Sequence, residues 1–245
     1  MENICKESAR NLVEMWRSDI SALASEEKAR HLRRFFKTGK GEYGEGDIFV
    51  GLTVPQVREI SKKYVSADFD AIHEMLMSDF HEYRLCALFV LIKQFSSTRR
   101  SPERQKSILD FYLQHAERAN NWDLVDLSAP KILGEWMVDS PEPELLDKLA
   151  SSSSLWLQRI SIVSTLTLIR NGRFEDTLRL AKHFLNHRHD LMHKATGWML
   201  REIGKRDIDT LRAFLDEFTP RMPRTALRYA IERMDTEERN YYMHL

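Results

Sequence analysis

The segment from Asn120 to Trp136 sets a carboxylate among aromatic side chains, in a chain otherwise built of amphipathic helices. If Asn120 or Asn121 caps a helix, Trp122 and Asp126 are four residues apart and lie on one face of it. A carboxylate can stabilise developing positive charge, and the face of an indole ring attracts cations. This helix face is therefore the first candidate for an active surface.

The same two residues also have a purely structural explanation. Tryptophan is often a core residue, and an aspartate in the first turns of a helix is favoured by the helix dipole. Spacing alone leaves both interpretations open. The predicted helices around Trp122 and Asp126 provide further evidence.

Composition sets the limits on the kind of protein. The chain has 245 residues, 42% of them hydrophobic and 30% charged, which suits one large domain or one continuous array of repeats. Its 37 basic and 37 acidic residues balance, so any binding to nucleic acid depends on how the charge is distributed. Cys5 and Cys86 lie far apart in the sequence, as expected of reduced thiols.

The N-terminus lacks the basic and then apolar order of a signal peptide. The longest purely apolar run, from Leu85 to Ile92, is too short to span a bilayer. We therefore expect a soluble, cytoplasmic protein that does not use a membrane, and we expect it to be a monomer.

Helical periodicity runs through nearly the whole chain. It begins in residues 8–23 and 26–36, and from Asp68 onward the helices come in pairs at intervals of roughly 31 to 42 residues. The five pairs are 69–77 with 81–95, 102–115 with 122–138, 144–150 with 155–170, 174–185 with 191–204, and 208–218 with 224–234. This repetition predicts an all-α, stacked helical solenoid that forms a single domain over residues 1–245.

Alignment of the second helix of each pair places Arg84, Asp126, Arg159, Lys194 and Thr225 at equivalent positions. Equivalent residues of neighbouring repeats form a row along a solenoid, and a basic row on the concave face suits a phosphate backbone. Asp126 is the one acid in this row. Because a carboxylate facing a polyanion weakens binding, chemistry explains its presence better than affinity does.

The C-terminal half adds cations and a second indole. Between residues 155 and 206 there are 10 Lys and Arg against 4 Asp and Glu. Trp198 follows Lys194 by four residues and precedes Arg201 by three, so the three side chains share one helix face. A core tryptophan flanked by solvated cations explains this spacing equally well.

The only glycine-rich segment covers residues 37–46. Gly39, Gly41 and Gly44 match the G-x-G-x-x-G pattern, but the segment follows a helix and not a strand, so a dinucleotide site is not expected. One interpretation is a flexible surface loop. Another is a loop whose backbone amides, together with Lys37 and Lys40, approach phosphates closely.

Four histidines have spacings that resemble those of zinc ligands. They are His183, His187, His189 and His193. No cysteine lies near them, they straddle a predicted helix boundary, and the H-E-x-x-H motif is absent. A partly exposed basic turn is favoured, and we expect no metal.

Three motifs each combine a tryptophan with an acid, an arginine or both. They are Asn121-Trp-Asp-Leu-Val-Asp126, Trp156-Leu-Gln-Arg159 and Gly197-Trp-Met-Leu-Arg-Glu202. At these motifs, and over residues 30–235, the sequence resembles the AlkD-like DNA alkylation repair family, the HEAT-like-repeat DNA glycosylases. The resemblance implies a right-handed HEAT-like solenoid that holds duplex DNA on its concave face and excises alkylpurines whose ring is positively charged.

The resemblance also implies roles for single residues. The catalytic carboxylate falls at Asp126, the two lesion-flanking indoles at Trp122 and Trp198, the backbone-contacting arginines at Arg159 and Arg201, and an N-terminal aromatic of some members at Phe35. This chain has phenylalanine where a tyrosine stands in such members.

Physical chemistry supports a single carboxylate and no cofactor. Hydrolysis of an N-glycosidic bond passes through an oxocarbenium-like sugar, and ordinary glycosidases use two carboxylates because the leaving group must be protonated. A cationic purine leaves as a neutral base, so one anion that stabilises the sugar and orients water is sufficient. We therefore predict a DNA glycosylase for alkylated purines in double-stranded DNA. Its catalytic residues are Asp126, Trp122 and Trp198, and its DNA-binding residues are Arg159, Arg201, Lys194, Arg84, Lys37, Lys40 and Phe35.

Two other functions remain open. The first is a non-catalytic HEAT-repeat protein that binds damaged, bent or branched DNA through its backbone. The second is a protein-binding solenoid, which is the commonest use of helical repeats. The basic row argues against the second.

Overall fold

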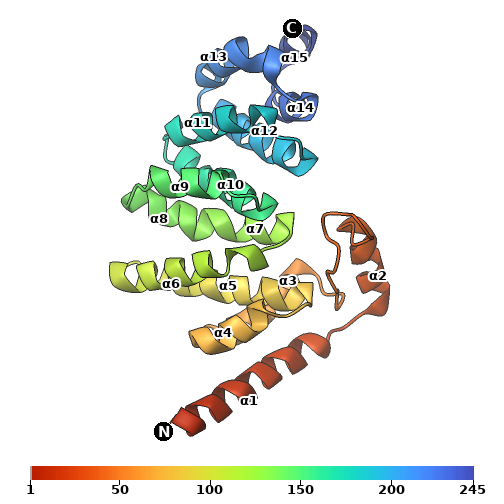
Figure 1. Cartoon of the computed structure of the whole chain (residues 1–245), viewed down its shortest axis with the longest axis vertical. Coiled ribbons are helices and arrows are strands. Elements are labelled where there is room, and N and C mark those ends of the chain that lie inside the picture. Colours follow the sequence, from red (N-terminus) through yellow and green to blue (C-terminus); the bar gives the residue numbers. More distant parts are fainter. Residues whose placement is uncertain (1) are drawn as a thin grey trace. The chain divides into compact units, whose positions relative to one another are not determined.

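The computed structural model describes residues 2–245, with side chains from residue 10 onward. The chain divides into two compact units, Met1–Leu124 and Val125–Leu245, and the division falls inside helix α7. The first unit contains α1 (Glu2–Ser21), α2 (Glu26–Phe35), α3 (Val54–Ser61), α4 (Phe69–Leu76), α5 (His81–Ser97), α6 (Pro102–Gln114) and the start of α7 (Trp122–Ser128) (Figure 1). The second contains α8 (Leu133–Asp139), α9 (Pro143–Ala150), α10 (Leu155–Arg170), α11 (Glu175–His183), α12 (Asp190–Gly204), α13 (Ile208–Phe218), α14 (Arg224–Ala230) and α15 (Thr236–His244).

The protein has an all-α helical-repeat fold, which confirms the predicted fold class. Within the described residues, β pairing is limited to one isolated parallel bridge between Ile48 and Phe80. Among the helices from residue 2 to 245, none combines the length and apolar character that a membrane span requires. The single domain over residues 1–245 stays a prediction.

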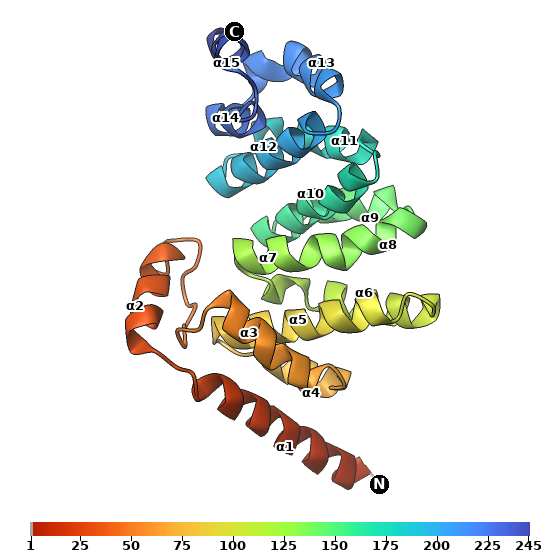
Figure 2. The same cartoon turned by 180° about the vertical axis from the view of Figure 1, so that it is seen from behind.

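Helix α5 is the centre of the first unit. Nearly all of its apolar residues are buried, because α3, α4 and α6 all pack against it (Figure 2). Trp16 of α1 stacks on Tyr64 with ring centroids 4.7 Å apart, and its Nε1 donates to the Cys86 sulfur at 3.1 Å. Burial raises the pKa of Cys86 to about 12, which is typical of an unreactive thiol in a protein core. The side chain of Cys5 lies outside the described residues.

Helix α10 has the same role in the second unit, where α8, α9 and α12 surround it. Two glycines permit close helix packing. A Cβ on Gly134 would lie 2.3 Å from the Ser164 backbone oxygen, and a Cβ on Gly197 would lie 2.3 Å from the Ala226 backbone oxygen. Side chains at these positions would push α8 away from α10 and α14 away from α12.

The predicted helix over 122–138 is wrong in one respect, because the structure divides it. Helix α7 ends at Ser128, a 3₁₀ turn covers Ala129–Lys131, and α8 starts at Leu133. Pro130 lies in this turn, and proline has no backbone N–H and clashes with the preceding helical turn. The result is a short α7 that carries both Trp122 and Asp126.

The segment between α2 and α3 is bonded to α5 and packs against the start of α2. The buried Glu82 carboxylate accepts hydrogen bonds from the backbone N–H groups of Val50, Gly51 and Leu52, at 2.8 to 3.1 Å. Gly51 has φ of 96°, and a Cβ there would lie 2.1 Å from the Ser25 backbone oxygen. Only glycine allows this approach to the start of α2.

Candidate functional site

Trp122 is the first residue of α7, and two phenylalanines from the end of α2 lie against its ring. Phe36 stacks on the indole with centroids 5.3 Å apart, and Phe35 meets it edge-on at 5.9 Å. Phe36 is buried, whereas Phe35 is 56% exposed. The structure therefore brings together two residues that the sequence predicted separately, Phe35 and Trp122.

A buried polar network lies next to this aromatic group, since the His81 ring is 5.1 Å from the Phe36 ring. Both ring nitrogens of His81 meet carboxylates: Nδ1 is 3.1 Å from Asp47 Oδ2, and Nε2 is 2.8 Å from Asp123 Oδ2. Arg84 forms an ion pair with Asp47, and its Nη1 donates to the Ser78 backbone oxygen at 2.8 Å. Asn121 Nδ2 also donates to Asp47, at 3.1 Å.

The sequence prediction for Arg84 is wrong. Its side chain is 1% exposed and is committed to Asp47 and the Ser78 backbone, so it cannot reach a phosphate. The repeat alignment found the correct helical position but could not show that a loop far from this helix in the sequence covers it. Asp47 comes from that loop, between α2 and α3.

Asp126 is held by Arg159 of the following repeat. Arg159 Nε donates to Asp126 Oδ1 and Nη2 donates to Oδ2, both at 2.9 Å. Arg159 Nη1 donates to the Leu191 backbone oxygen in the first turn of α12, at 2.6 Å. The Asp126 side chain is 19% exposed, so the carboxylate is fixed in direction and still open to solvent.

This geometry changes the role of Arg159. The sequence motif predicted that its guanidinium contacts a phosphate, but the side chain is buried and its donors point to Asp126 and Leu191. Two hydrogen bonds from one planar guanidinium restrict the rotation of the carboxylate. Arg159 is therefore placed to orient Asp126 and not to contact a DNA backbone.

Helix α12 carries the second group of predicted residues. Trp198 is half-buried, and its Nε1 donates to Glu202 Oε1 at 3.2 Å. Arg201 forms an ion pair with Glu232, which follows α14. Lys194 pairs with Asp190 one turn earlier, at 2.8 Å. All three predicted side chains are thus partly accessible on one helix.

The glycine-rich loop holds its own carboxylates. Gly39 N–H donates to Glu42 and Gly41 N–H donates to Glu45, both at 2.8 Å. A phosphate would have to displace these carboxylates to reach the two amides. The accessible cations of the loop are the exposed Lys37 and Lys40, and Lys37 has φ of 51°, in the left-handed region that favours glycine.

The histidine group is held by ordinary turn contacts. His187 Nδ1 accepts from the His189 backbone N–H, and His189 Nδ1 accepts from the Leu191 backbone N–H. These bonds use ring lone pairs that a metal would need. Among the described residues, no three His, Cys, Asp or Glu side chains gather as a metal site.

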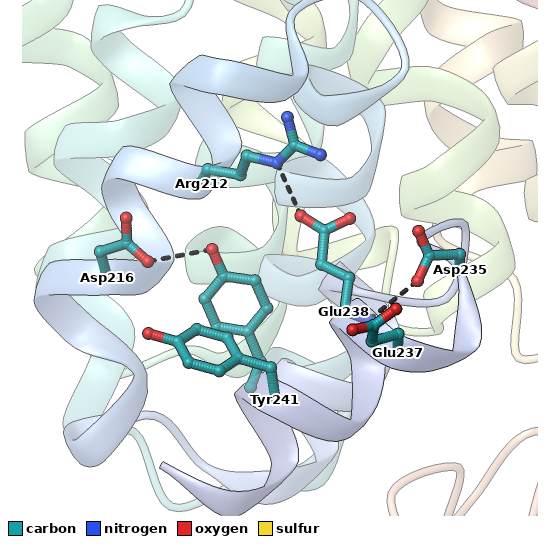
Figure 3. Close-up of a pocket in the computed structure, with 7 residues that line it drawn as sticks. Arg212, Asp216, Asp235, Glu237, Glu238 and Tyr241 are labelled. Carbon is teal, nitrogen blue, oxygen red and sulfur yellow. Dashed lines mark hydrogen bonds and ion pairs between the residues drawn. The ribbon is translucent and has the colours of Figure 1, made fainter.

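A pocket of about 550 Å³ near the C-terminus has the wrong charge for DNA. Figure 3 shows the Arg212–Glu238 ion pair at this pocket, and the Tyr242 hydroxyl donates to Asp216 at 3.0 Å. Its lining residues are Arg212, Asp216, Asp235, Glu237, Glu238, Tyr241 and Tyr242. Four carboxylates against one guanidinium repel a phosphate backbone.

A family model described as DNA alkylation repair enzyme matches residues 16–234 of the chain. The chain belongs to this family. A solved structure described as a predicted DNA alkylation repair enzyme from Enterococcus faecalis is also similar, with a TM-score of 0.68 and 17% sequence identity. The match covers 87% of this chain and 97% of that one, and at this identity it concerns the fold. No curated protein matches.

Membership of the DNA alkylation repair enzyme family confirms the predicted resemblance and supports a role in the repair of alkylated DNA. It makes DNA the expected substrate or partner. Sequence reasoning missed the buried group around His81 in this repair protein. One signal was available, since His81, Glu82 and Arg84 open a helix that is otherwise mostly apolar.

Proposed function

We propose that the chain is a DNA glycosylase that hydrolyses the N-glycosidic bond of positively charged alkylpurines in duplex DNA. The observation that carries the proposal is the carboxylate of Asp126, which is partly open to solvent and fixed by two hydrogen bonds from Arg159. Family membership supports a repair role and leaves the reaction to be tested.

The chemistry requires one fixed anion. As the bond between C1′ and the purine nitrogen breaks, its electron pair goes to the base and neutralises the ring, while positive charge develops on the sugar. Asp126 stabilises that charge and accepts a hydrogen bond from the attacking water. The water oxygen then bonds to C1′, and its proton is released to solvent.

Two indoles serve the cationic base. Trp122 precedes Asp126 by one turn of α7, and Trp198 lies on α12, whose first turn is bonded to Arg159. Contact of a cation with an indole face contributes about 0.5 to 2 kcal/mol, which a normal neutral purine does not receive. Phe35 offers an exposed ring beside Trp122.

The accessible cations would bind the phosphates of the DNA backbone. Lys194 and Arg201 lie on α12, and Lys37 and Lys40 lie in the loop after α2. Lys194 and Arg201 are paired with acids in the free protein, so DNA binding would exchange those partners for phosphates.

The deciding experiment measures release of methylated purines from duplex DNA treated with dimethyl sulfate. Wild type should release them, and Asp126→Asn should lose release while retaining DNA binding. Asp139→Asn is the matched control, because Asp139 is an exposed aspartate on α8. Equal release by Asp126→Asn and wild type would remove Asp126 from catalysis.

One observation favours a second candidate, a non-catalytic protein that binds damaged, bent or branched DNA. Arg159 engages both oxygens of Asp126 and so offsets its negative charge. This function would give salt-dependent DNA binding with no release of any methylated purine, from wild type or variants.

A further inference from the structure

His81 begins helix α5 and is 2% exposed, yet both of its ring nitrogens face carboxylate oxygens. A neutral imidazole has only one N–H, so one of these contacts would oppose two lone pairs. The imidazolium satisfies both contacts, because it donates one N–H to Asp47 and the other to Asp123. Burial alone would lower the pKa of His81, but the two carboxylates outweigh it and raise the pKa to about 9.

The buried group is balanced in charge. Asp47 and Asp123 carry two negative charges, and His81 and Arg84 carry two positive charges. The free energy needed to remove four charges from water offsets much of the attraction between them. A buried charged group is therefore weak evidence for a contribution to stability. Their effect on the position of neighbouring residues is the better explanation.

Three contacts connect this group to Trp122. Asp123, which is bonded to His81, is the next residue in α7. Asn121, which is bonded to Asp47, precedes Trp122 and accepts its backbone N–H at 2.9 Å. The Phe36 ring lies 5.1 Å from the imidazole and 5.3 Å from the indole. The backbone on both sides of Trp122 and one contact of its ring therefore depend on the same network.

We propose that His81 is a positioning residue, whose imidazolium fixes Trp122 in the orientation that contacts the cationic base. This inference rests on the proposed glycosylase function. The charge balance also fits the role, because an uncompensated imidazolium near Trp122 would repel a cationic purine. With Asp47 and Asp123 in place, the network holds the indole without that repulsion.

The test is a double-mutant cycle between His81 and Trp122. His81→Gln removes the charge and one donor, and it should lower the single-turnover release of methylated purines about tenfold or more. In a Trp122→Ala background the same change should have almost no further effect, since the indole it positions is gone. Equal losses in both backgrounds would overturn the proposal. His73→Gln is the matched control, because His73 is exposed on α4.

A second variant covers the case in which His81→Gln does not fold. The double variant His81→Leu with Asp123→Leu removes one charge of each sign and leaves the Asp47–Arg84 pair intact. It should reproduce the loss of release and reduce the preference for methylated over unmethylated duplex. A lower folded fraction would reduce binding to both duplexes equally and would leave the preference for methylated duplex unchanged. If this double variant shows normal release and an unchanged preference, His81 does not position Trp122.

A spectroscopic readout separates this inference from the proposed function. At pH 8 the nitrogen chemical shifts of His81 should be those of a doubly protonated ring, and His81→Gln should shift the indole N–H resonance of Trp122. If wild type releases no methylated purine but this resonance shifts, the glycosylase function fails and the positioning of Trp122 stands. If wild type is active and the resonance does not move, the positioning role fails.

Discussion

Arg159 donates one hydrogen bond to each carboxylate oxygen of Asp126, and both are 2.9 Å long. The two residues come from consecutive repeats, 33 positions apart. Arg159 also bonds to the Leu191 backbone, so the carboxylate is tied to the start of α12. In the proposed reaction this arrangement fixes the direction of the anion before the substrate binds.

The first prediction follows from that pairing. Arg159→Gln should lower the release of methylated purines about tenfold to a hundredfold, because Asp126 loses its fixed orientation. The slope of log affinity against log salt should not change, since the buried guanidinium does not contact phosphate. Both quantities are measured on duplex DNA treated with dimethyl sulfate.

Arg179→Gln provides the control for loss of a positive charge, because Arg179 is a partly exposed arginine on α11 in the same unit. It should leave release unchanged. If Arg159→Gln reduces the slope of log affinity against log salt by about 1, Arg159 contacts a phosphate, as its sequence motif predicted.

The Asp126–Arg159 pair also shows what a sequence can predict in a repeat protein. Alignment of helical pairs places both residues at the same position of consecutive repeats, so their proximity follows from periodicity. The pattern does not show whether a neighbouring acid and base face solvent or bond to each other. The helical-repeat fold was predictable for the same reason, since it depends on local periodicity.

Periodicity could not predict the buried network around His81. Its contacts join residues 34 to 74 positions apart, and Asp47 reaches it from an irregular segment with no periodicity. The division of the helix after Ser128 was a different case. Pro130 was visible in the sequence, and its effect on the preceding turn is general.

The second prediction concerns alkaline pH. Burial would lower the pKa of His81, but Asp123 and Asp47 raise it from 6.5 to about 9. Because the folded-state pKa is the higher one, its stabilisation is complete below pH 6.5 and is lost as the pH rises through about 9. The loss should amount to about 3 kcal/mol, measured by urea unfolding between pH 6 and pH 10.

The matched measurement uses His81→Gln. This variant should lose the fall in the free energy of unfolding that His81 causes between pH 6.5 and about 9, and it should keep the pH dependence that comes from other groups. Burial lowers the pKa of Arg84, the other cation of the network, but Arg84 is present in both proteins, so the comparison isolates the contribution of His81. A wild-type stability that is flat from pH 6.5 to pH 9 would contradict the charged state of His81.

The third prediction tests the packing of α12. A Cβ on Gly197 would lie 2.3 Å from the Ala226 backbone oxygen and 2.5 Å from the Tyr229 Cβ, so Gly197→Ala must displace α14. We expect a loss of about 1 to 3 kcal/mol, seen as a lower Tm. Release of methylated purines should also fall, because Trp198 is the next residue. Gly204→Ala is the control: the three atoms nearest to its Cβ would all belong to the flexible Leu211 side chain, so the loss of stability should be smaller.

The last prediction concerns the loop after α2. Lys37 and Lys40 are exposed, and Lys37 keeps a side chain at a backbone angle that favours glycine. If both contact phosphates, the double change Lys37→Gln with Lys40→Gln should make the slope of log affinity against log salt less steep by about 2. The effect should be the same on methylated and unmethylated duplex, because phosphate contacts carry no information about the base. Lys62→Gln with Lys63→Gln removes two exposed lysines elsewhere in the first unit, and it should leave the slope unchanged. A slope that responds equally to both pairs would mean that general surface charge, and not this loop, attracts the DNA.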